Sequence, residues 1–325
     1  MFGNREKRQK KILGRDEEED SITYNETYHY IFRADMSNGT LDDKVTIFNV
    51  PFISISTILS RYVSLISNIP MRILESQGEG IFSRDVKVGQ MMFEGMDVNK
   101  AYQPLIHLAP LGFPPEFVGD TFALFNRWNG STHQWKIKAG VKDSSTIGNI
   151  MSFNGETRLS YWNHNSLPRS EQEYCNRLNG SDGTLNPPMV TRDRPLYVFN
   201  PFLCRSVHLK YSHEVTSLGI NGYRFTFTKD VFSSPDKNPD NECFCGKPGG
   251  SLNQECIDGG YRLFSCHSDA PIVITKPHFA EADPKYAKNV DGIVPDAEKY
   301  ASYADVEPIS GMLIKANLKV QVNIE

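Results

Sequence analysis

Residues 238–245 read Asn-Pro-Asp-Asn-Glu-Cys-Phe-Cys and lie in a region that contains every cysteine of the chain. The first 174 residues contain no cysteine. The six cysteines are Cys175, Cys204, Cys243, Cys245, Cys256 and Cys266. An even number of cysteines crowded into one segment is typical of a disulfide framework, and we predict that all six are paired.

A zinc site is the alternative interpretation of the same region. Its ligands would be Cys243, Cys245, Cys256, Cys266 and His267. Zinc sites usually contain cysteine pairs that are two to four residues apart, whereas one residue separates Cys243 from Cys245. The spacing therefore favours disulfides over zinc.

Four N-glycosylation sequences support an exported protein. They begin at Asn25, Asn38, Asn129 and Asn179. Three of the four contain Asn-Gly, a pair that favours exposed turns. We therefore predict glycosylation at these four asparagines and an extracellular or luminal environment, in which disulfides also persist.

Composition places the chain among soluble globular proteins. Of its 325 residues, 39% are hydrophobic and 23% are charged, and the net charge is −4. These values exclude disordered and collagen-like classes. Because the net charge is negative, we expect no nucleic-acid partner.

Membrane and export signals are missing from the sequence. Residues 47–59 are the most apolar stretch, but they fall short of the roughly 20 apolar residues that a spanning helix needs. The N-terminus carries no apolar signal core. Since the cysteines and glycosylation sequences indicate export, we expect the chain to be a piece of a longer protein.

The N-terminal residues are strongly charged. Residues 5–15 contain six basic side chains, and residues 16–20 form an acidic block. We expect a solvated charged segment here, with a nuclear localisation signal as the less favoured alternative.

One region has helical periodicity. After an extended stretch at residues 45–51, apolar side chains recur every three or four positions at Ile55, Leu59, Tyr62, Ile66, Ile69 and Ile73. This pattern predicts an amphipathic helix that Pro70 divides in two. A further short helix is expected at residues 86–94.

Elsewhere the pattern alternates between apolar and polar residues. Strands are expected at residues 135–139, 195–202, 223–227, 271–279 and 317–324. Turns are expected at the Asn-Gly or Asp-Gly pairs that begin at Asn129, Asn154, Asp182, Asn221 and Asp291. The chain is therefore predicted to be α+β, with an antiparallel sheet or barrel and a helical insertion.

Motifs of the common enzyme classes are missing as well. The sequence has no Gly-x-Ser-x-Gly and no P-loop, and His213-Glu214 lacks the second histidine of a zinc protease. Asp236 and Asp240 do not have the spacing of a calcium loop. We expect no catalytic residue, no metal and no cofactor, and a secreted enzyme is the most remote hypothesis.

A series of short motifs runs through the second half of the chain. They are residues 159–162, Cys175 with 179–182, 203–206, 238–245, 277–279, 291–292 with Pro295, and 305–311. From residue 159 onward, the chain resembles the ectodomain of the class B scavenger receptor family, and residues 238–245 are the most specific match. Residues 5–8 and 86–97 match more loosely, so the resemblance covers nearly the whole chain.

This resemblance implies an antiparallel β-barrel core, capped by an apex bundle of short helices at about residues 52–95 and enclosing an apolar tunnel. Residues 1–325 would form one partial ectodomain, whose two flanking membrane helices lie outside this chain. The resemblance also implies the pairs Cys175–Cys243, Cys204–Cys266 and Cys245–Cys256 within the disulfide-rich segment 175–266. Sequence alone leaves 15 pairings open.

The function implied by the resemblance is that of a membrane receptor that binds lipids and transfers them through the tunnel of its ectodomain. Its ligands would be fatty acids, sterol esters or lipoprotein particles, and its ectodomain would face outward at the plasma membrane or, alternatively, the lysosomal lumen. Candidate ligand-binding residues of the apex are Ile58, Arg61, Tyr62, Leu65, Ile69, Arg72, Ile73 and Arg84. The alternative is a lysosomal sorting receptor or sensory co-receptor whose apex binds a protein.

One departure from the family pattern bears on the ligand. Where some members carry a pair of lysines after the apex helix, residues 75–79 read Glu-Ser-Gln-Gly-Glu. This acidic stretch disfavours capture of polyanionic ligands and favours neutral lipids or fatty acids.

Overall fold

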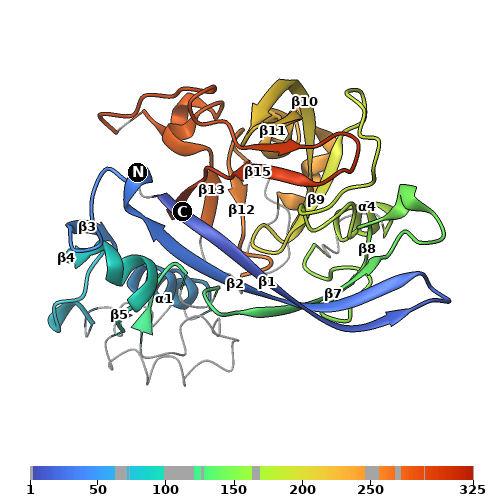
Figure 1. The fold of residues 1–325 in the computed structure, drawn as a ribbon. Coiled ribbons are helices and arrows are strands. Elements are labelled where there is room, and N and C mark those ends of the chain that lie inside the picture. Colours follow the sequence, from blue (N-terminus) through green and yellow to red (C-terminus); the bar gives the residue numbers. More distant parts are fainter. Residues whose placement is uncertain are drawn as a thin grey trace.

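Antiparallel strands make up most of the chain. The computed structural model describes residues 3–62, 72, 74–98, 121–125, 128–162, 169–245, 256–267, 272–288 and 290–324. The fold is mixed α+β with few helices, a curled antiparallel sheet and three disulfides, as predicted (Figure 1). No helix among the described residues is long and apolar enough to cross a membrane.

The first sheet has four strands in the order β1-β2-β7-β8. They are β1 (Gly3–Asp16), β2 (Ser21–Arg33), β7 (Thr132–Lys138) and β8 (Ile150–Phe153). Residues 5–20 are mostly exposed to solvent, as expected, but they are not irregular, because β1 pairs with β2 along its whole length in a long hairpin (Figure 1). Most side chains of β1 are exposed to solvent, whereas Arg8 and Lys10 reach inward to the acidic partners described below.

The second sheet has five strands in the order β15-β14-β11-β10-β9. They are β9 (Leu196–Asn200), β10 (Arg205–Ser217), β11 (Ile220–Phe227), β14 (Tyr303–Val306) and β15 (Leu313–Asn317). The alternation at residues 195–202 and 223–227 therefore does correspond to strands.

A short seam, residues 179–182, joins the two sheets. The N–H of Ile150 in β8 donates to the carbonyl of Gly180 (2.9 Å), and the N–H of Phe199 in β9 donates to the carbonyl of Ser181 (2.9 Å). Gly180 has φ +80°, and a Cβ there would lie 1.9 Å from the carbonyl oxygen of Tyr197. The close approach requires glycine.

Three smaller sheets complete the described strands. One contains β12 (Tyr261–Arg262), β13 (Ile272–Thr275) and β16 (Gln321–Ile324), and the others pair β3 (Lys44–Phe48) with β4 (Phe82–Lys87) and β5 (Met96–Asp97) with β6 (Thr121–Phe122). The strand expected at 317–324 is instead divided between β15 and β16, which pair with different partners. The strand expected at 271–279 ends at Thr275 and gives way to a 3-10 helix.

The apex helix is α1 (Val50–Tyr62), and it begins earlier than expected. Asn49 caps it, because the side-chain oxygen of Asn49 accepts the N–H of Phe52 (3.2 Å). Pro51 lies in the first turn, where its missing N–H has no partner to lose. Phe52 and Ile55 of this helix are buried.

Other helical segments are short. The helix expected at residues 86–94 starts only at Val88, after β4, and contains a π-helix at Gln90–Glu94. A further α-helix is α4 (Arg169–Cys175), and residues 74–76 are also helical. The 3-10 helices are Ala34–Met36, Ser144–Thr146, Lys229–Phe232, Pro239–Phe244, Pro277–Phe279 and Pro284–Tyr286.

One predicted turn lies elsewhere. Asn221 and Gly222 are part of β11, and the β10–β11 hairpin turns at Leu218-Gly219 instead. A Cβ on Gly222 would lie 2.9 Å from the carbonyl oxygen of Val306, so this glycine serves close strand packing rather than a turn. The Asn129, Asn154 and Asp291 pairs do lie in turns.

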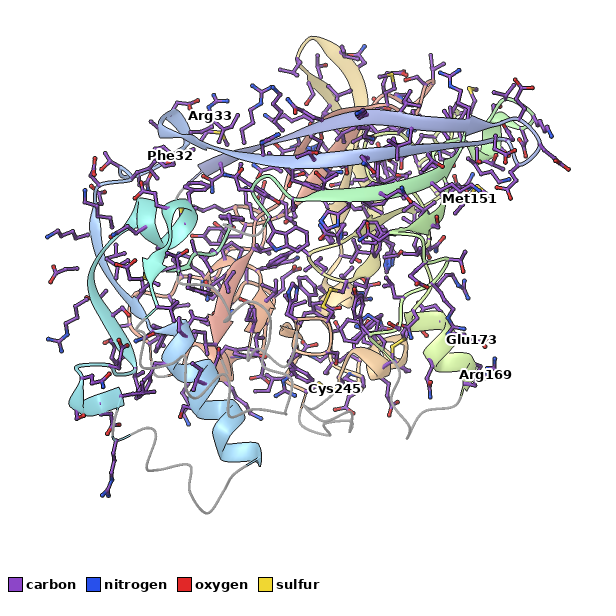
Figure 2. All side chains as sticks on the ribbon, turned by 90° about the horizontal axis from the view of Figure 1, so that it is seen from below. Phe32, Arg33, Met151, Arg169, Glu173 and Cys245 are labelled. Atoms are coloured by element: carbon purple, nitrogen blue, oxygen red, sulfur yellow. A yellow bond between two sulfur atoms is a disulfide. The ribbon has the colours of Figure 1, made fainter. Side chains whose placement is uncertain are left out.

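The three disulfides join Cys175 to Cys243, Cys204 to Cys266, and Cys245 to Cys256, the pairing that the resemblance implies. They surround an apolar core that includes Trp162, Leu203 and Leu263. Figure 2 shows side chains filling the space between the first sheet and this region, with Arg169 and Glu173 of α4 on the outside. Since all six cysteines are paired, the zinc alternative has no thiolates available.

Candidate functional site

Six aromatic rings form a connected group between the first sheet and the disulfide region, which we call the aromatic wall. Its members are Tyr28, Trp128, His133, Phe153, Phe202 and His267. Successive ring centroids are 5.3–5.7 Å apart. Trp128, His133 and Phe202 are only half-buried although they contact one another. The wall is therefore an apolar surface that its own packing does not fully cover.

Strand alternation explains why part of this wall forms. In β2 the alternate residues Tyr24, Glu26 and Tyr28 are buried. Register places Glu26 opposite His133 and Tyr24 opposite Trp135. Alternate side chains of neighbouring strands share one face of a sheet, so β2, β7 and β8 present their aromatic rings to the same interior.

His133 gives the wall one polar atom. Its Nε2 is buried and has no hydrogen-bond partner among the described residues, while its Nδ1 lies 3.3 Å from the amide nitrogen of Asn154. Burial lowers the pKa of His133, so the ring is neutral near physiological pH. A neutral imidazole with a free nitrogen can hydrogen-bond a ligand without placing a charge beside the aromatic rings.

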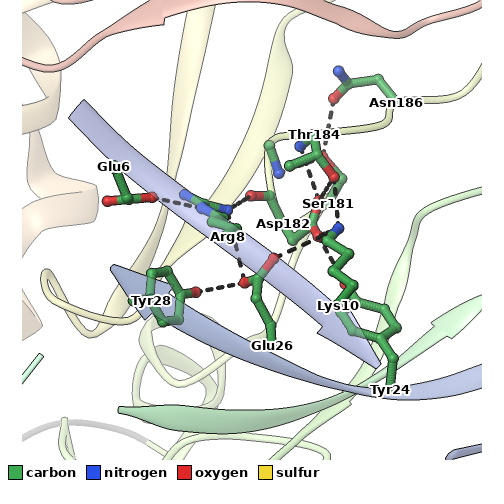
Figure 3. Close-up of polar contacts among 11 residues, drawn as sticks. Glu6, Arg8, Lys10, Tyr24, Glu26, Tyr28, Ser181, Asp182, Thr184 and Asn186 are labelled. Carbon is green, nitrogen blue, oxygen red and sulfur yellow. Dashed lines mark hydrogen bonds and ion pairs between the residues drawn. The ribbon is translucent and has the colours of Figure 1, made fainter. Parts of the chain in front are cut away.

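A cluster of charged side chains lies next to the wall (Figure 3). We call it the charge cluster: Arg8, Lys10, Glu26 and Asp182. Lys10 pairs with Asp182 and lies 3.6 Å from Glu26, and Arg8 donates to the carbonyl oxygen of Asp182 (2.8 Å). Two cations face two carboxylates, so the cluster is close to neutral when all four are ionised.

Tyrosines connect the charge cluster to the aromatic wall. The hydroxyl of Tyr28 donates to Glu26 Oε2 (2.7 Å), and the hydroxyl of Tyr24 donates to Asp182 Oδ2 (2.7 Å) (Figure 3). The Arg8 guanidinium also lies 5.2 Å from the ring centroid of Tyr28. Tyr28, a member of the wall, thus contacts the charge cluster, and the β1–β2 hairpin is attached to the seam through Asp182.

The two carboxylates differ in pKa. Burial raises the pKa of Glu26, with Asp182 adding to the effect and Arg8 and Lys10 opposing it. Burial would also raise the pKa of Asp182, but Lys10 and Thr184 lower it to about 2. Asp182 is therefore a firmly ionised anchor, whereas Glu26 is the carboxylate of the cluster that takes up a proton first as pH falls.

Sequence reasoning missed Arg205, a buried cation in the disulfide region. Its guanidinium lies 3.6 Å from the ring centroid of Phe244 and 5.3 Å from that of Tyr261. It donates to the carbonyl oxygen of Val231 (3.2 Å) and to Asn241 Oδ1 (3.3 Å). Burial lowers the pKa of Arg205, although Tyr261 and Tyr174 oppose this. Its position directly after Cys204 was the signal that could have identified it.

The candidate apex residues are described in part. Ile58, Arg61 and Tyr62 lie in the last two turns of α1, and Arg72 and Arg84 are exposed, the latter in β4. Leu65, Ile69 and Ile73 lie outside the described residues.

The four glycosylation asparagines occupy different surroundings. Asn38 and Asn129 are exposed, whereas Asn25 in β2 and Asn179 in the seam are half-buried. The side-chain oxygen of Asn129 accepts the N–H of Tyr30 (3.1 Å). Glycosylation at all four remains a prediction.

Metal binding finds little support among the described side chains. The one group with metal-ligand spacing there is Cys204, Cys266 and His267. Its two sulfurs form a disulfide, and His267 Nε2 lies 2.9 Å from the carbonyl oxygen of Phe202. The arrangement thus serves packing around the disulfide and offers one histidine at most.

A disulfide-stapled, curled antiparallel fold with an aromatic interior can be compared with known families. A model of the CD36 family matches residues 2–325. The chain belongs to the CD36 family. The resemblance to class B scavenger receptors is thereby confirmed, and family membership supports a receptor function rather than an enzymatic one.

Similar curated proteins carry receptor and membrane-protein names. Sensory neuron membrane protein 2 of Manduca sexta is 30% identical over 94% of this chain and 61% of its own length. Scavenger receptor class B member 1 of Sus scrofa is 28% identical over 94% of this chain and 56% of its own length. Lysosome membrane protein 2 of Mus musculus is 26% identical over 90% of this chain and 56% of its own length. The chain thus spans little more than half the length of the relatives it matches.

Proposed function

We propose that this chain is the greater part of the ectodomain of a membrane-anchored receptor, and that a lipid acyl chain binds against the aromatic wall. Disulfides and the four glycosylation sequences support an extracellular or luminal position, and the names of the relatives support a membrane. We place the receptor at the plasma membrane facing outward, with the lysosomal lumen as the alternative. The flanking membrane helices belong to the longer parent protein.

The observation that carries this proposal is the incomplete burial of the aromatic wall. Trp128 contacts both His133 and Phe202, yet all three rings keep surface that no described side chain covers. An acyl chain that replaces water there gains roughly 0.8 kcal/mol per buried CH₂ group. The unpartnered Nε2 of His133 gives a fatty-acid or ester oxygen one hydrogen-bonding position.

The charge cluster supports a polar end to such a site. Arg8 lies next to Tyr28 of the wall and Lys10 lies next to Tyr24, but each cation is already paired with a carboxylate. The carboxylate of an ionised fatty acid would compete with Glu26 and Asp182 for these cations. The proposal therefore favours neutral lipids and protonated or ester head groups over strongly anionic ones, in agreement with the acidic stretch at residues 75–79.

Binding of a fluorescent long-chain fatty acid and a fluorescent cholesteryl ester tests this proposal. We expect saturable binding that Trp128→Ala weakens by about tenfold, because part of the apolar contact is removed. Tyr197→Ala, which removes a partly exposed aromatic ring outside the wall, is the matched control and should leave affinity unchanged. No saturable binding, or equal loss in both variants, would sink the proposal.

A stacked pair of exposed aromatic rings favours a second candidate, a protein ligand at the apex. The ring centroids of Phe48 and Phe82 are 5.2 Å apart, beside the start of α1, and each residue is more than half exposed. We would place a photo-reactive residue at Phe82 in the full receptor on cells. A single cross-linked protein that forms without added lipid would favour this candidate, whereas cross-links to lipid alone would argue against it.

A further inference from the structure

Three turns at one end of the five-stranded sheet carry large, exposed apolar side chains. They are Met189 (73% exposed), Leu218 (80%), Ile220 (47%), Ile309 (71%) and Met312 (57%). Of the four large apolar side chains in the described residues that exceed 70% exposure, three belong to this set, and Val141 is the fourth. We call the set the apolar tips.

Backbone contacts bring the three turns together. The N–H of Met189 donates to the carbonyl of Ile309 (3.1 Å), and Val190 donates to the carbonyl of Pro308 (2.7 Å). Strand β11 runs beside β14, with Tyr223 opposite Val306, so the Leu218 turn and the Ile309 turn lie at the same end. The β10–β11 hairpin lies on the side of the molecule away from α1 (Figure 1).

Two of these exposed apolar residues also have an unfavourable backbone conformation. Leu218 has φ +52° and Met189 has φ +58°, a left-handed conformation that bulky residues rarely adopt. Both positions of the Leu218-Gly219 turn have positive φ, a geometry that favours Asn-Gly. An Asn-Gly pair stands only three residues away, within β11. A leucine that is both strained and exposed gains nothing from folding, so its use points to an external contact.

The tips are held rigidly. The carboxylate of Glu307 accepts the N–H groups of Ile309 (3.0 Å) and Ser310 (2.6 Å), which fixes the second turn. The hydroxyl of Ser217, directly before Leu218, donates to Asp305 (2.5 Å), whose carboxylate Arg224 also holds. Apolar side chains on rigid supports need not lose conformational freedom when they enter an apolar phase.

Shape and charge indicate what that phase is. A groove of about 360 Å³, lined by Glu214, Tyr223 and Pro308 among others, separates the hairpin from the Pro308 turn, so the tips are separate points and not a continuous patch. Glu214 is paired with Arg192, which leaves the groove close to neutral. Separate apolar points without excess positive charge suit shallow insertion between the head groups of an uncharged bilayer.

We propose that the apolar tips insert into the head-group region of a zwitterionic lipid bilayer. Because relatives carry membrane-protein names, a bilayer is the apolar phase nearest to this ectodomain. The contact orients the five-stranded sheet with its β10–β11 end toward the membrane. It does not depend on the aromatic wall, so it can fail or hold independently of the proposed lipid-binding function.

Co-flotation of the disulfide-bonded 325-residue chain with dioleoylphosphatidylcholine vesicles tests this proposal. We expect the chain to bind, and the triple variant Met189→Gly, Leu218→Asn, Ile309→Ser to lower the partition coefficient by about tenfold or more, because three insertion points are lost. Val141→Ser removes an equally exposed apolar side chain elsewhere and should change partitioning less than about twofold. Phosphatidylserine or high salt should have little effect, because the contact is apolar.

Several outcomes would overturn the proposal. They are no binding to vesicles, unchanged partitioning of the triple variant, an equal loss in Val141→Ser, and binding that requires phosphatidylserine and disappears in salt. Self-association of the chain through the tips, measured by analytical ultracentrifugation and abolished in the triple variant, would also replace the bilayer as the occupant. The thermal midpoint of the triple variant should be no lower than that of the unmodified chain, because glycine and asparagine relieve the left-handed strain.

Discussion

The disulfide region at residues 175–266 and the β1–β2 hairpin at residues 3–33 belong to different sheets of the fold and are fixed by different interactions. Three covalent links and an apolar core hold the first, and Arg205 lies between aromatic rings within it. The hairpin contains no cysteine, and it is attached to the seam by the ion pair of Lys10 with Asp182 and by the hydrogen bond from Arg8 to the carbonyl oxygen of Asp182. Disulfides are indifferent to pH, whereas ion pairs depend on it, so reductant and acid should act on different sides of the molecule.

Removal of the Cys175–Cys243 link should have the largest effect on the first region. Its partners are 68 residues apart in sequence, so the double substitution Cys175→Ala, Cys243→Ala should lower the free energy of unfolding by about 4 kcal/mol in the loop-entropy model. The matched control is Cys245→Ala, Cys256→Ala, whose partners are 11 residues apart and whose loss should be nearer 3 kcal/mol. Urea unfolding followed by circular dichroism measures both. A larger loss of unfolding free energy in the control would show that local packing, and not loop length, determines how much each disulfide stabilises the fold.

Removal of Asp182 should have the next largest effect, and it acts on the hairpin. Asp182→Ala leaves Lys10 and the hydroxyl of Tyr24 without their buried acceptor, so we expect a loss of about 3 kcal/mol in the free energy of unfolding. Asp35→Ala removes an exposed partner of Arg33 in the same hairpin region and should change stability little. Hydrogen exchange should show the loss of protection concentrated in β1 and β2; uniform loss across the chain would contradict a local attachment.

The charge cluster predicts opposite pH dependences for its two carboxylates. Folded Glu26 binds its proton more tightly than the unfolded chain does, so its contribution to stability falls as pH rises from the ordinary to the raised pKa. Folded Asp182 binds its proton more weakly, with a pKa of about 2, so its contribution is present above the ordinary carboxyl pKa and is lost as pH falls toward 2.

These signs can be separated by two variants. Measured against the unmodified chain, the free energy of unfolding of Glu26→Gln should rise as pH rises above the ordinary glutamate pKa of about 4.3. The free energy of unfolding of Asp182→Asn should approach that of the unmodified chain only in strong acid. Unfolding free energies measured across the acid and neutral range give both difference curves. Difference curves with the same pH dependence would show that the pKa values of Glu26 and Asp182 are not shifted in opposite directions.

The smallest expected effect lies at the β10–β11 turn, which none of the three disulfides closes. Leu218→Asn should raise the free energy of unfolding by about 1 kcal/mol, because asparagine adopts the left-handed conformation more readily than leucine. The gain should be the same with and without reductant and across neutral pH, which makes it a baseline for the other comparisons. A loss of stability would mean that the leucine side chain packs within the folded chain.

Local sequence pattern was sufficient for much of the fold. The cysteine spacing indicated disulfides, and the alternation at residues 135–139 and 223–227 identified the central strands β7 and β11. The helical period after Asn49 identified α1, although the proline at position 51 suggested a later start than the cap allows. These elements share a feature: the interactions that define them lie within one turn or one strand.

The hairpin could not be read from its own residues. In β1 charged side chains occupy both faces, so the alternation that normally identifies a strand is hidden. What fixes Lys10 is Asp182, 172 residues later, and a contact of that separation leaves no trace in a local pattern. The aromatic wall escaped prediction for the same reason, since Trp128 and Phe202 meet only in the folded chain. Arg205 was a buried cation that composition alone would place at the surface.

The seam has a consequence for how the protein is made. Asn179 is a predicted glycosylation position, and the hydroxyl that completes its sequence, on Ser181, is buried and donates to Asn186 (3.1 Å). An enzyme that reads both groups has to reach them before Ile150 and Phe199 close on this segment. A sugar on Asn179 would therefore report the order of two events. The modified fraction of exported molecules would show how often the transferase acted before the two sheets joined.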